Sequence, residues 1–118
     1  MIKSYRDLNV YKDSYDLAIR VYKLSGNVPE REQYAIGSQI RRAVTSIPMN
    51  IAEGYGKKES AAEFKRFLRM AAGSVNEVEV LLDILNDLGY IRKNDHQELR
   101  RCYEIVGKQI HTLIRRWK

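Results

Sequence analysis

Residues 52–60, Ala-Glu-Gly-Tyr-Gly-Lys-Lys-Glu-Ser, contain the residue types of a phosphate-binding loop. A P-loop needs a glycine, four further residues and then Gly-Lys-Ser/Thr after a strand, because its backbone N–H groups must wrap a phosphate. Here Ile51 stands five residues before Gly56, Lys57 is followed by Lys58, and the preceding segment has the pattern of a helix. The spacing therefore excludes a P-loop. Lys57 and Lys58 remain candidates for contacts to a phosphate backbone.

Glu53 is the carboxylate of this stretch that would serve as a general base in an enzyme. Catalysis would need a nucleophile, a histidine or a metal ligand beside it, and none accompanies it in the sequence. A di-iron bundle needs Glu-x-x-His, and neither His96 nor His111 has a glutamate three residues earlier. We expect a protein that is not an enzyme, with no catalytic residue, no metal and no cofactor.

The elements that position these residues are helices. Apolar residues recur at intervals of three and four in four segments, about 7–25, from near Glu30 to Gly54 and Gly56, 61–88 and about 95–116. No run of alternating residues predicts a strand. Short connections between long helices favour a single all-α domain, 1–118, folded as an antiparallel up-down-up-down four-helix bundle.

Pro48 falls inside the second helical segment. A proline removes one helix hydrogen bond and crowds a carbonyl at a cost of about 3 kcal/mol or more, so we expect helix 2 to kink there. Polar residues flank the apolar stripe near this point and face similar residues on helix 3. We expect them to form a structural polar network of Arg42, Ser46, Asn50, Glu53, Ser74 and Glu77.

Helices 1 and 3 contain more apolar residues than one stripe requires. The first helix is expected to bury Leu8, Tyr11, Tyr15, Ala18 and Tyr22, which leaves a second apolar set on the opposite face. Helix 3 has a similar second set. Surplus apolar surface usually marks association, so we expect a homo-oligomer whose interface contains Val10, Leu17, Val21, Leu24, Met70, Gly73, Val80 and Ile84.

The charge distribution is the main functional clue. The net charge is +6 and the isoelectric point is about 9.5, which favours an anionic partner. Between Met70 and Ile91 all charges are acidic, whereas basic residues gather on helix 4 and around the start of helix 3. We therefore expect contacts to the backbone of RNA or DNA through Lys57, Lys58, Arg101, Lys108 and Arg115.

Composition also bears on membrane association, on cellular location and on the role of the cysteine. The chain has no apolar window long enough to span a membrane and no pattern of a secretory signal, so we expect no membrane partner and a cytoplasmic location. Cys102 is the single cysteine and is expected to be a small core residue.

Residues 39–60 and 63–91 also resemble a known family. Their most specific residues are Arg42, Ser46, Ile47, Pro48, Asn50, Ile51, Ala52, Glu53, Gly54 and Gly56, followed by Phe64, Gly73, Ser74 and Glu77. In this pattern the chain resembles the four-helix-bundle proteins encoded in intervening sequences of bacterial 23S rRNA genes, a family related to the accessory variability protein of diversity-generating retroelements. The resemblance implies a closed bundle, a homopentamer, no enzymatic activity and association with nucleic acid.

Two functional interpretations remain open from the sequence. In the first, an oligomeric bundle binds structured RNA or DNA by charge. In the second, the bundle is a protein–protein scaffold or adaptor, and its basic face is solvated or docks an acidic protein.

Overall fold

Four α-helices make up most of the chain, and the computed structural model describes all residues from 1 to 118. The helices are α1 (Asn9–Leu24), α2 (Ile36–Tyr55), α3 (Ala61–Asp87) and α4 (Lys93–Arg116). Three short 3-10 turns flank α1 and precede α2, at Tyr5–Asp7, Ser25–Asn27 and Glu30–Glu32. No strand is present, and the predicted all-α class is confirmed.

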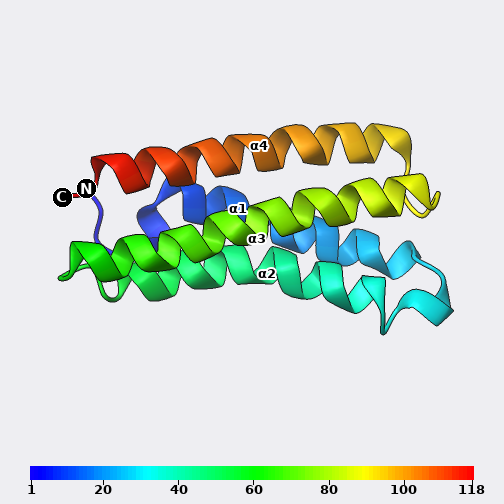
Figure 1. The fold of residues 1–118 in the computed structure, drawn as a ribbon, viewed down its shortest axis with the longest axis horizontal. Helices are drawn as coiled ribbons and strands as arrows, with labels where there is room; N and C mark the ends of the chain where they lie inside the picture. The colour runs from blue at the N-terminus through cyan, green and yellow to red at the C-terminus, as the bar shows by residue number, and fades with distance from the viewer.

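The helices lie side by side and alternate in direction along the long axis of the molecule (Figure 1). The principal extents are 44 × 24 × 21 Å. α2 packs against α3, α3 against α4, and α1 against both α2 and α4, which makes a four-helix bundle. The contact between α1 and α4 is the least extensive of the four.

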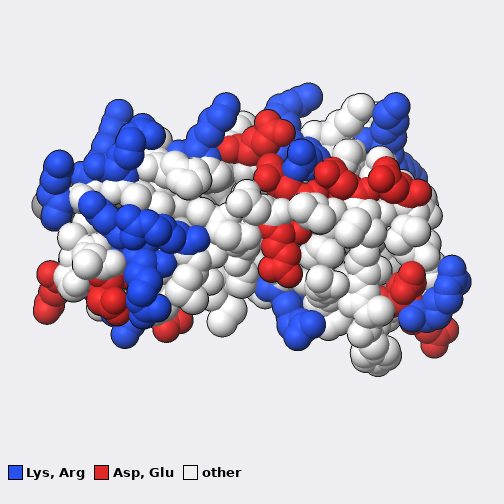
Figure 2. Space-filling model, viewed as in Figure 1, with Lys and Arg blue, Asp and Glu red and all other residues white.

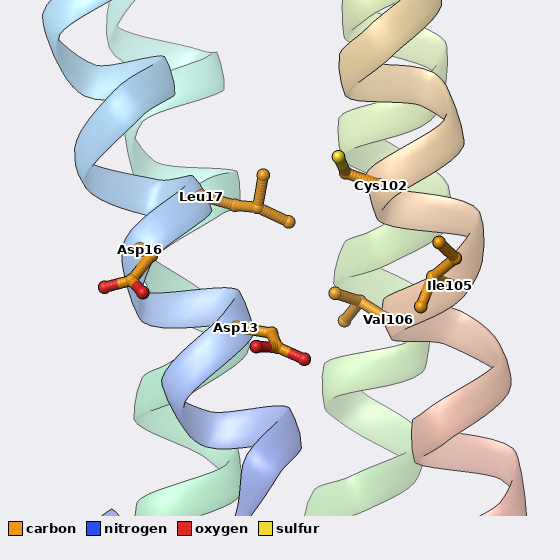
Figure 3. Close-up of a pocket in the computed structure, with 6 residues that line it drawn as sticks. All are labelled: Asp13, Asp16, Leu17, Cys102, Ile105 and Val106. Atoms are coloured by element: carbon orange, nitrogen blue, oxygen red, sulfur yellow. The ribbon is translucent and has the colours of Figure 1, made fainter.

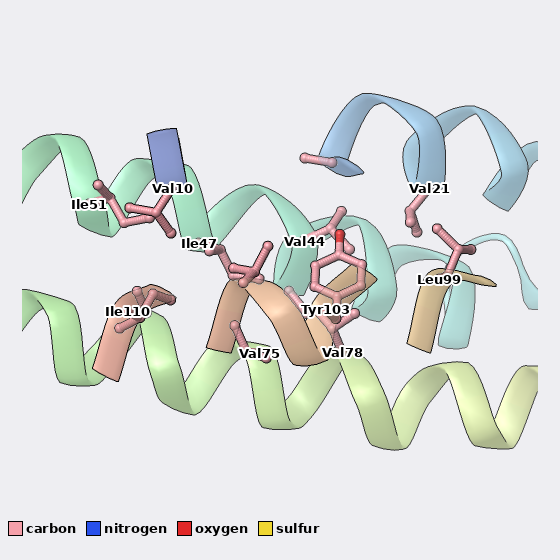
Figure 4. Packing of buried hydrophobic residues seen from close by; sticks show 14 of the residues in the cluster. Val10, Val21, Val44, Ile47, Ile51, Val75, Val78, Leu99, Tyr103 and Ile110 are labelled. Carbon is pink, nitrogen blue, oxygen red and sulfur yellow. The ribbon is translucent and has the colours of Figure 1, made fainter. Parts of the chain in front are cut away.

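Side chains from all four helices form one continuous hydrophobic core. Figure 4 shows part of this core, where the following residues meet: Val10, Val21, Val44, Ile47, Ile51, Val75, Val78, Leu99, Tyr103 and Ile110. Each fully buried Val, Leu or Ile side chain contributes about 1.5–3 kcal/mol through removal of apolar surface from water. This burial is the main reason that the amphipathic segments hold together.

The face of α1 that enters the core agrees only in part with the predicted one, because Ala18 is buried as predicted but the tyrosines are not. Val10 and Val21 are only 5% and 1% exposed, whereas Tyr15 and Tyr22 are 48% and 52% exposed. The helix buries or half-buries all four aliphatic residues that the sequence pattern assigns to an oligomer surface, Val10, Leu17, Val21 and Leu24. An aliphatic side chain has no polar atom to satisfy, whereas a tyrosine at the border keeps its hydroxyl group in water. The assignment of Val10 and Val21 to an oligomer interface is therefore wrong, whereas that of the half-buried Leu17 and Leu24 stays a prediction.

α2 begins later than the sequence predicts. Glu30 lies in a 3-10 turn after Pro29, and the non-helical backbone of Ala35 separates this turn from the α-helix that starts at Ile36. The helix then continues through Pro48, which is buried, to Tyr55. The kink at Pro48 stays a prediction.

Local hydrogen bonds set the beginnings of two elements. Ser60 Oγ accepts a hydrogen bond from the backbone N–H of Glu63 at 3.2 Å and caps α3. The Glu63 carboxylate pairs with Arg66, with Nε at 3.1 Å, instead of bonding back to Ser60. At the N-terminus, Ser4 and Asp7 form a complete capping box around the first 3-10 turn, which fixes Tyr5 beside α1.

None of the four helices combines the length and the apolar composition that a membrane crossing needs.

Candidate nucleic-acid interface

The bundle is electrically polarised along its length. One half contains residues 1–15, 46–76 and 106–118, because the start of α1, the turn from α2 to α3 and the end of α4 all lie at the same end (Figure 1). This half, which we call the basic end, has twelve Lys and Arg against five Asp and Glu. The remaining half has nine basic and ten acidic residues. Figure 2 shows basic side chains crowded at this end, whereas acidic and basic side chains are interspersed along the other half of the visible face.

An aromatic cluster brings two of the basic segments together. The ring of Trp117, just after α4, lies 4.7 Å from the ring of Phe64 on α3 in an edge-to-face arrangement. Tyr55, at the end of α2, lies 5.9 Å from Phe64 and 6.4 Å from Trp117. Such pairs contribute about 0.5–1.5 kcal/mol beyond burial. They hold the C-terminal residues of α4 against the turn between α2 and α3.

The predicted phosphate-contacting residues are thereby divided into two groups. Lys57, Lys58, Lys108 and Arg115 belong to the basic end, and all four are exposed without an ion pair to an acidic residue. Arg101 is also exposed, but it lies fourteen residues before Arg115 on α4, about 21 Å along the helix axis. Arg101 is therefore too far from Arg115 for the two residues to contact the same group of phosphates.

The ammonium groups of Lys57 and Lys58, the two lysines in the turn before α3, each lie near an aromatic ring. Lys58 Nζ lies 4.5 Å from the centre of the Tyr55 ring, and Lys57 Nζ lies 5.7 Å from that of Phe67. Arg66 also lies against Phe67, but its charge is compensated by Glu63. The two lysines are thus partly ordered cations at the start of a 27-residue helix, whose N-terminus favours negative charge.

The structure places three of the six residues of the predicted polar network in contact. Ser46 Oγ lies 2.7 Å from Ser74 Oγ, and it also donates to the carbonyl group of Ala43. Asn50 Nδ2 donates to the Ser46 carbonyl oxygen at 2.9 Å. The Ser46–Ser74 contact joins α2 to α3 at the middle of both helices, and the other two hydrogen bonds lie within α2.

The other three side chains of the predicted network lie outside it. Arg42, Glu53 and Glu77 are exposed, and their side chains make no hydrogen bond or ion pair within the chain. Inclusion of these residues was wrong for a single chain, because their positions on the helices direct them outward from the seam that Ser46 and Ser74 occupy.

α3 presents the remaining part of the predicted interface. Met70, Val80 and Ile84 are exposed, and Gly73 lies among them with open space around its Cα. Leu88 extends this apolar surface toward the end of the helix. We call these five residues the α3 strip.

A groove between α1 and α2 was not predicted from the sequence. It has a volume of about 430 Å³ and is lined mainly by apolar and aromatic residues, Tyr5, Tyr11, Tyr15, Ala18, Ile19, Thr45, Pro48, Met49, Ala52 and Glu53. Burial raises the pKa of the Tyr11 hydroxyl group. The repeated tyrosines on one face of α1 were a signal for the groove, but the sequence pattern assigned them to the core.

A second groove follows the open seam between α1 and α4. Figure 3 shows Leu17 of α1 opposite Cys102, Ile105 and Val106 of α4, with Asp13 and Asp16 at the α1 side. The volume is about 300 Å³. Cys102 is half-buried here and is not the core residue that the sequence predicts. No group of three or more His, Cys, Asp and Glu residues in the chain is arranged to hold a metal ion.

The fold and its surface define a small four-helix-bundle protein with segregated charge. The profile of the 23S rRNA-intervening sequence protein family matches residues 6–112, and the chain belongs to this family.

A solved structure supports the same relationship. The crystal structure of a protein of unknown function from the S23 ribosomal protein family of Bacteroides thetaiotaomicron has a TM-score of 0.81 and 28% sequence identity to this chain. The similarity covers 90% of this chain and 95% of the other. A search of curated proteins found no match.

Proposed function

We propose that this protein binds structured RNA or DNA without catalysing a reaction, and that the basic end contacts the phosphate backbone. The observation that carries the proposal is the segregation of charge, with twelve basic and five acidic residues in one half of the bundle and near balance in the other. A solvated surface does not require the two signs to separate in this way. A nucleic acid is a polyanion, and it would bind such a segregated basic surface more tightly because several of its phosphates could contact basic residues at once.

The cations best placed for this role belong to two neighbouring segments, Lys57 and Lys58 in the turn before α3, and Arg115 and Arg116 at the end of α4. All four are exposed and free of acidic partners. Each neutralised phosphate releases bound counterions, so the affinity should fall steeply with salt. Phosphate contacts give affinity but little sequence preference.

The test is a fluorescence anisotropy titration of duplex DNA and hairpin RNA across a salt series. The first variant replaces Lys57, Lys58, Arg115 and Arg116 with Gln. We expect its affinity for duplex DNA to fall by at least about tenfold. The slope of the logarithm of the association constant against the logarithm of the salt concentration should become shallower by about 3–4. The matched control replaces four exposed cations outside the basic end, Lys23, Arg92, Lys93 and Arg101, and should change both quantities much less.

Two results would contradict the proposal. Absence of binding at low salt would leave the protein scaffold as the better interpretation. Equal losses in the two variants would show that only the total charge matters, not the basic end.

We also propose that the chain forms a homo-oligomer through the α3 strip. The exposed apolar residues of this strip support the proposal, as does the open space beside Gly73, which would allow another helix to approach closely. The family resemblance favours a pentamer. Val80→Glu should reduce the sedimentation coefficient at micromolar concentration, whereas Ile105→Glu, on an exposed residue of α4 outside the strip, should not. A wild-type monomer would overturn the proposal.

A further inference from the structure

The groove between α1 and α2 combines aromatic walls with one charged group. Tyr5, Tyr11 and Tyr15 form a row along it, with ring centres 4.9 Å and 5.9 Å apart. Pro48 and Met49 of α2 line the other side. Tyr15 is 48% exposed, so its ring is accessible to a ligand. A planar heteroaromatic ring fits this setting, since base–aromatic stacking is worth about 1–3 kcal/mol per base.

Glu53 is the one charged residue among the ten that line the groove. Its carboxylate makes no hydrogen bond or ion pair within the chain. A carboxylate offers two acceptor oxygens and no donor. It therefore suits a ring that presents two adjacent N–H donors.

Among the nucleobases, guanine meets this requirement. Its Watson–Crick edge presents N1–H and the N2 amino group side by side. Adenine and cytosine each present one amino group beside a ring nitrogen that repels a carboxylate, and uracil presents one N–H between two carbonyl groups. Unpaired bases expose these edges in loops and single strands.

The surroundings of the groove suit the phosphates on either side of such a base. Arg6 lies with its guanidinium carbon 4.8 Å from the centre of the Tyr5 ring. Lys57 and Lys58 follow Glu53 by four and five residues, about one helical turn. The groove therefore opens onto the basic end, so that a strand lying there has cations for its backbone next to an aromatic site for a base.

We propose that the α1–α2 groove binds an unpaired guanine of RNA or DNA, with the exposed ring of Tyr15 stacking on the base and Glu53 accepting hydrogen bonds from N1–H and N2–H. This inference rests on the proposed nucleic-acid function and adds a base preference to it. Backbone contacts alone would give none.

The test uses labelled ten-nucleotide RNAs that consist of uridine except for one central G, A, C or U. Fluorescence anisotropy at fixed low salt gives the dissociation constant of each. We expect the wild type to prefer the G strand to the all-U strand by at least about fivefold, and Tyr15→Ala to lose at least about fivefold in affinity for the G strand. Tyr34→Ala, on a fully exposed tyrosine that does not line the groove, should not.

Glu53→Gln separates the hydrogen bonds from the charge. Removal of a negative charge strengthens binding of every strand, so the measured quantity is the ratio of the G and U affinities. We expect this ratio to fall to about one in Glu53→Gln. In Glu59→Gln, which removes the same charge from the same end outside the groove, the ratio should be retained.

Each other outcome overturns the inference in a recognisable way. Salt-dependent binding of all four strands with equal affinity refutes the guanine site and leaves the proposed function intact. Absence of binding to every strand refutes both. If Tyr15→Ala dissociates the oligomer in sedimentation while Glu53→Gln leaves the G-to-U ratio unchanged, the groove is a contact between subunits.

Discussion

The backbone of α2 at Gly54 passes so close to Phe67 of α3 that a Cβ atom at Gly54 would lie only 2.6 Å from the Phe67 Cβ atom. Phe64 would also be crowded, with its ring carbon at 3.1 Å. Two helical turns earlier, Ser46 and Ser74 join the same pair of helices. The glycine is therefore required for the close approach of α2 and α3, and not for a turn, since it lies inside α2.

Gly54→Ala should destabilise the fold. Alanine gains up to about 1 kcal/mol in helix propensity, but overpacking typically costs about 1–3 kcal/mol, so we expect a net loss in the free energy of unfolding, measured with urea. Gly107→Ala, inside α4 and outside the α3 strip, is the control, because its added methyl group would meet only the Val75 side chain, at an ordinary contact distance of 3.6 Å. This variant should be as stable as the wild type or more so. If the Gly54→Ala protein were as stable as the wild type, α2 and α3 would be able to move apart and admit the methyl group without loss of stability.

The Ser46–Ser74 hydrogen bond should appear as a coupling energy. In a double-mutant cycle of Ser46→Ala and Ser74→Ala, we expect about 0.5–1.5 kcal/mol, because either single change already removes the hydrogen bond between the two hydroxyl groups. Ser14 provides the control, since its hydroxyl group donates to the carbonyl group of Tyr11 within α1. The cycle of Ser46→Ala with Ser14→Ala should show no coupling. Similar values in both cycles would contradict the contact.

Tyr103 offers a test of an unpaired buried group. Its hydroxyl group is fully buried without a hydrogen-bond partner, and burial raises the pKa of Tyr103. Because an unsatisfied buried polar group costs about 1–3 kcal/mol, Tyr103→Phe should leave the free energy of unfolding unchanged or raise it. Tyr90→Phe is the matched change at a tyrosine that donates to Glu32 at 3.0 Å, and it should lower stability. A loss in Tyr103→Phe would reveal a partner for its hydroxyl group.

The N-terminal turn should make stability depend on pH. The Asp7 carboxylate accepts hydrogen bonds from the backbone N–H groups of Lys3 and Ser4 at 2.8 and 3.1 Å, and these bonds hold its pKa below the usual 3.8. A lowered native pKa means that the stabilisation is complete above 3.8 and is lost as pH falls through the native value.

Asp7→Asn should therefore lower the melting temperature at pH 7, and the difference from the wild type should shrink on acidification. Asp16→Asn, at an exposed residue whose side chain forms no hydrogen bond or ion pair in the chain, is the control and should show little difference at either pH. If Asp7→Asn lowers the melting temperature by the same amount at pH 7 and at acidic pH, the charge of the Asp7 carboxylate is excluded as the cause.

The sequence predicts the four helices well because their apolar period is long and regular. On α1, however, two apolar faces compete, and periodicity alone does not decide between them. Packing against α2 and α4 selects Val10 and Val21, and the tyrosines then line the surface. The tyrosine groove could not be expected while those rings were assigned to the core.

The proposed contact surface was partly predictable for a topological reason. In an up-down bundle the end of helix 4 returns to the start of helix 3, so Arg115 is expected at the same end as Lys57 and Lys58. The same reasoning separates Arg101 from them. Which residues of a polar flank touch one another depends on where each lies around its helix: Ser46 lies at the seam and reaches Ser74, whereas Arg42 and Glu77 are exposed and unpaired.

Residues 1 and 118 lie near each other, at the same end of the bundle as the turn between α2 and α3 (Figure 1). An affinity tag or reporter fused to either of them would lie at the basic end, which contains Lys57 and Lys58, and would shield it from a nucleic acid. A circular permutant avoids this difficulty, since a short linker between residues 118 and 1 allows the chain to be reopened among residues 26–35, at the opposite end. Immobilised through those new termini, the bundle would present its cationic end to solution.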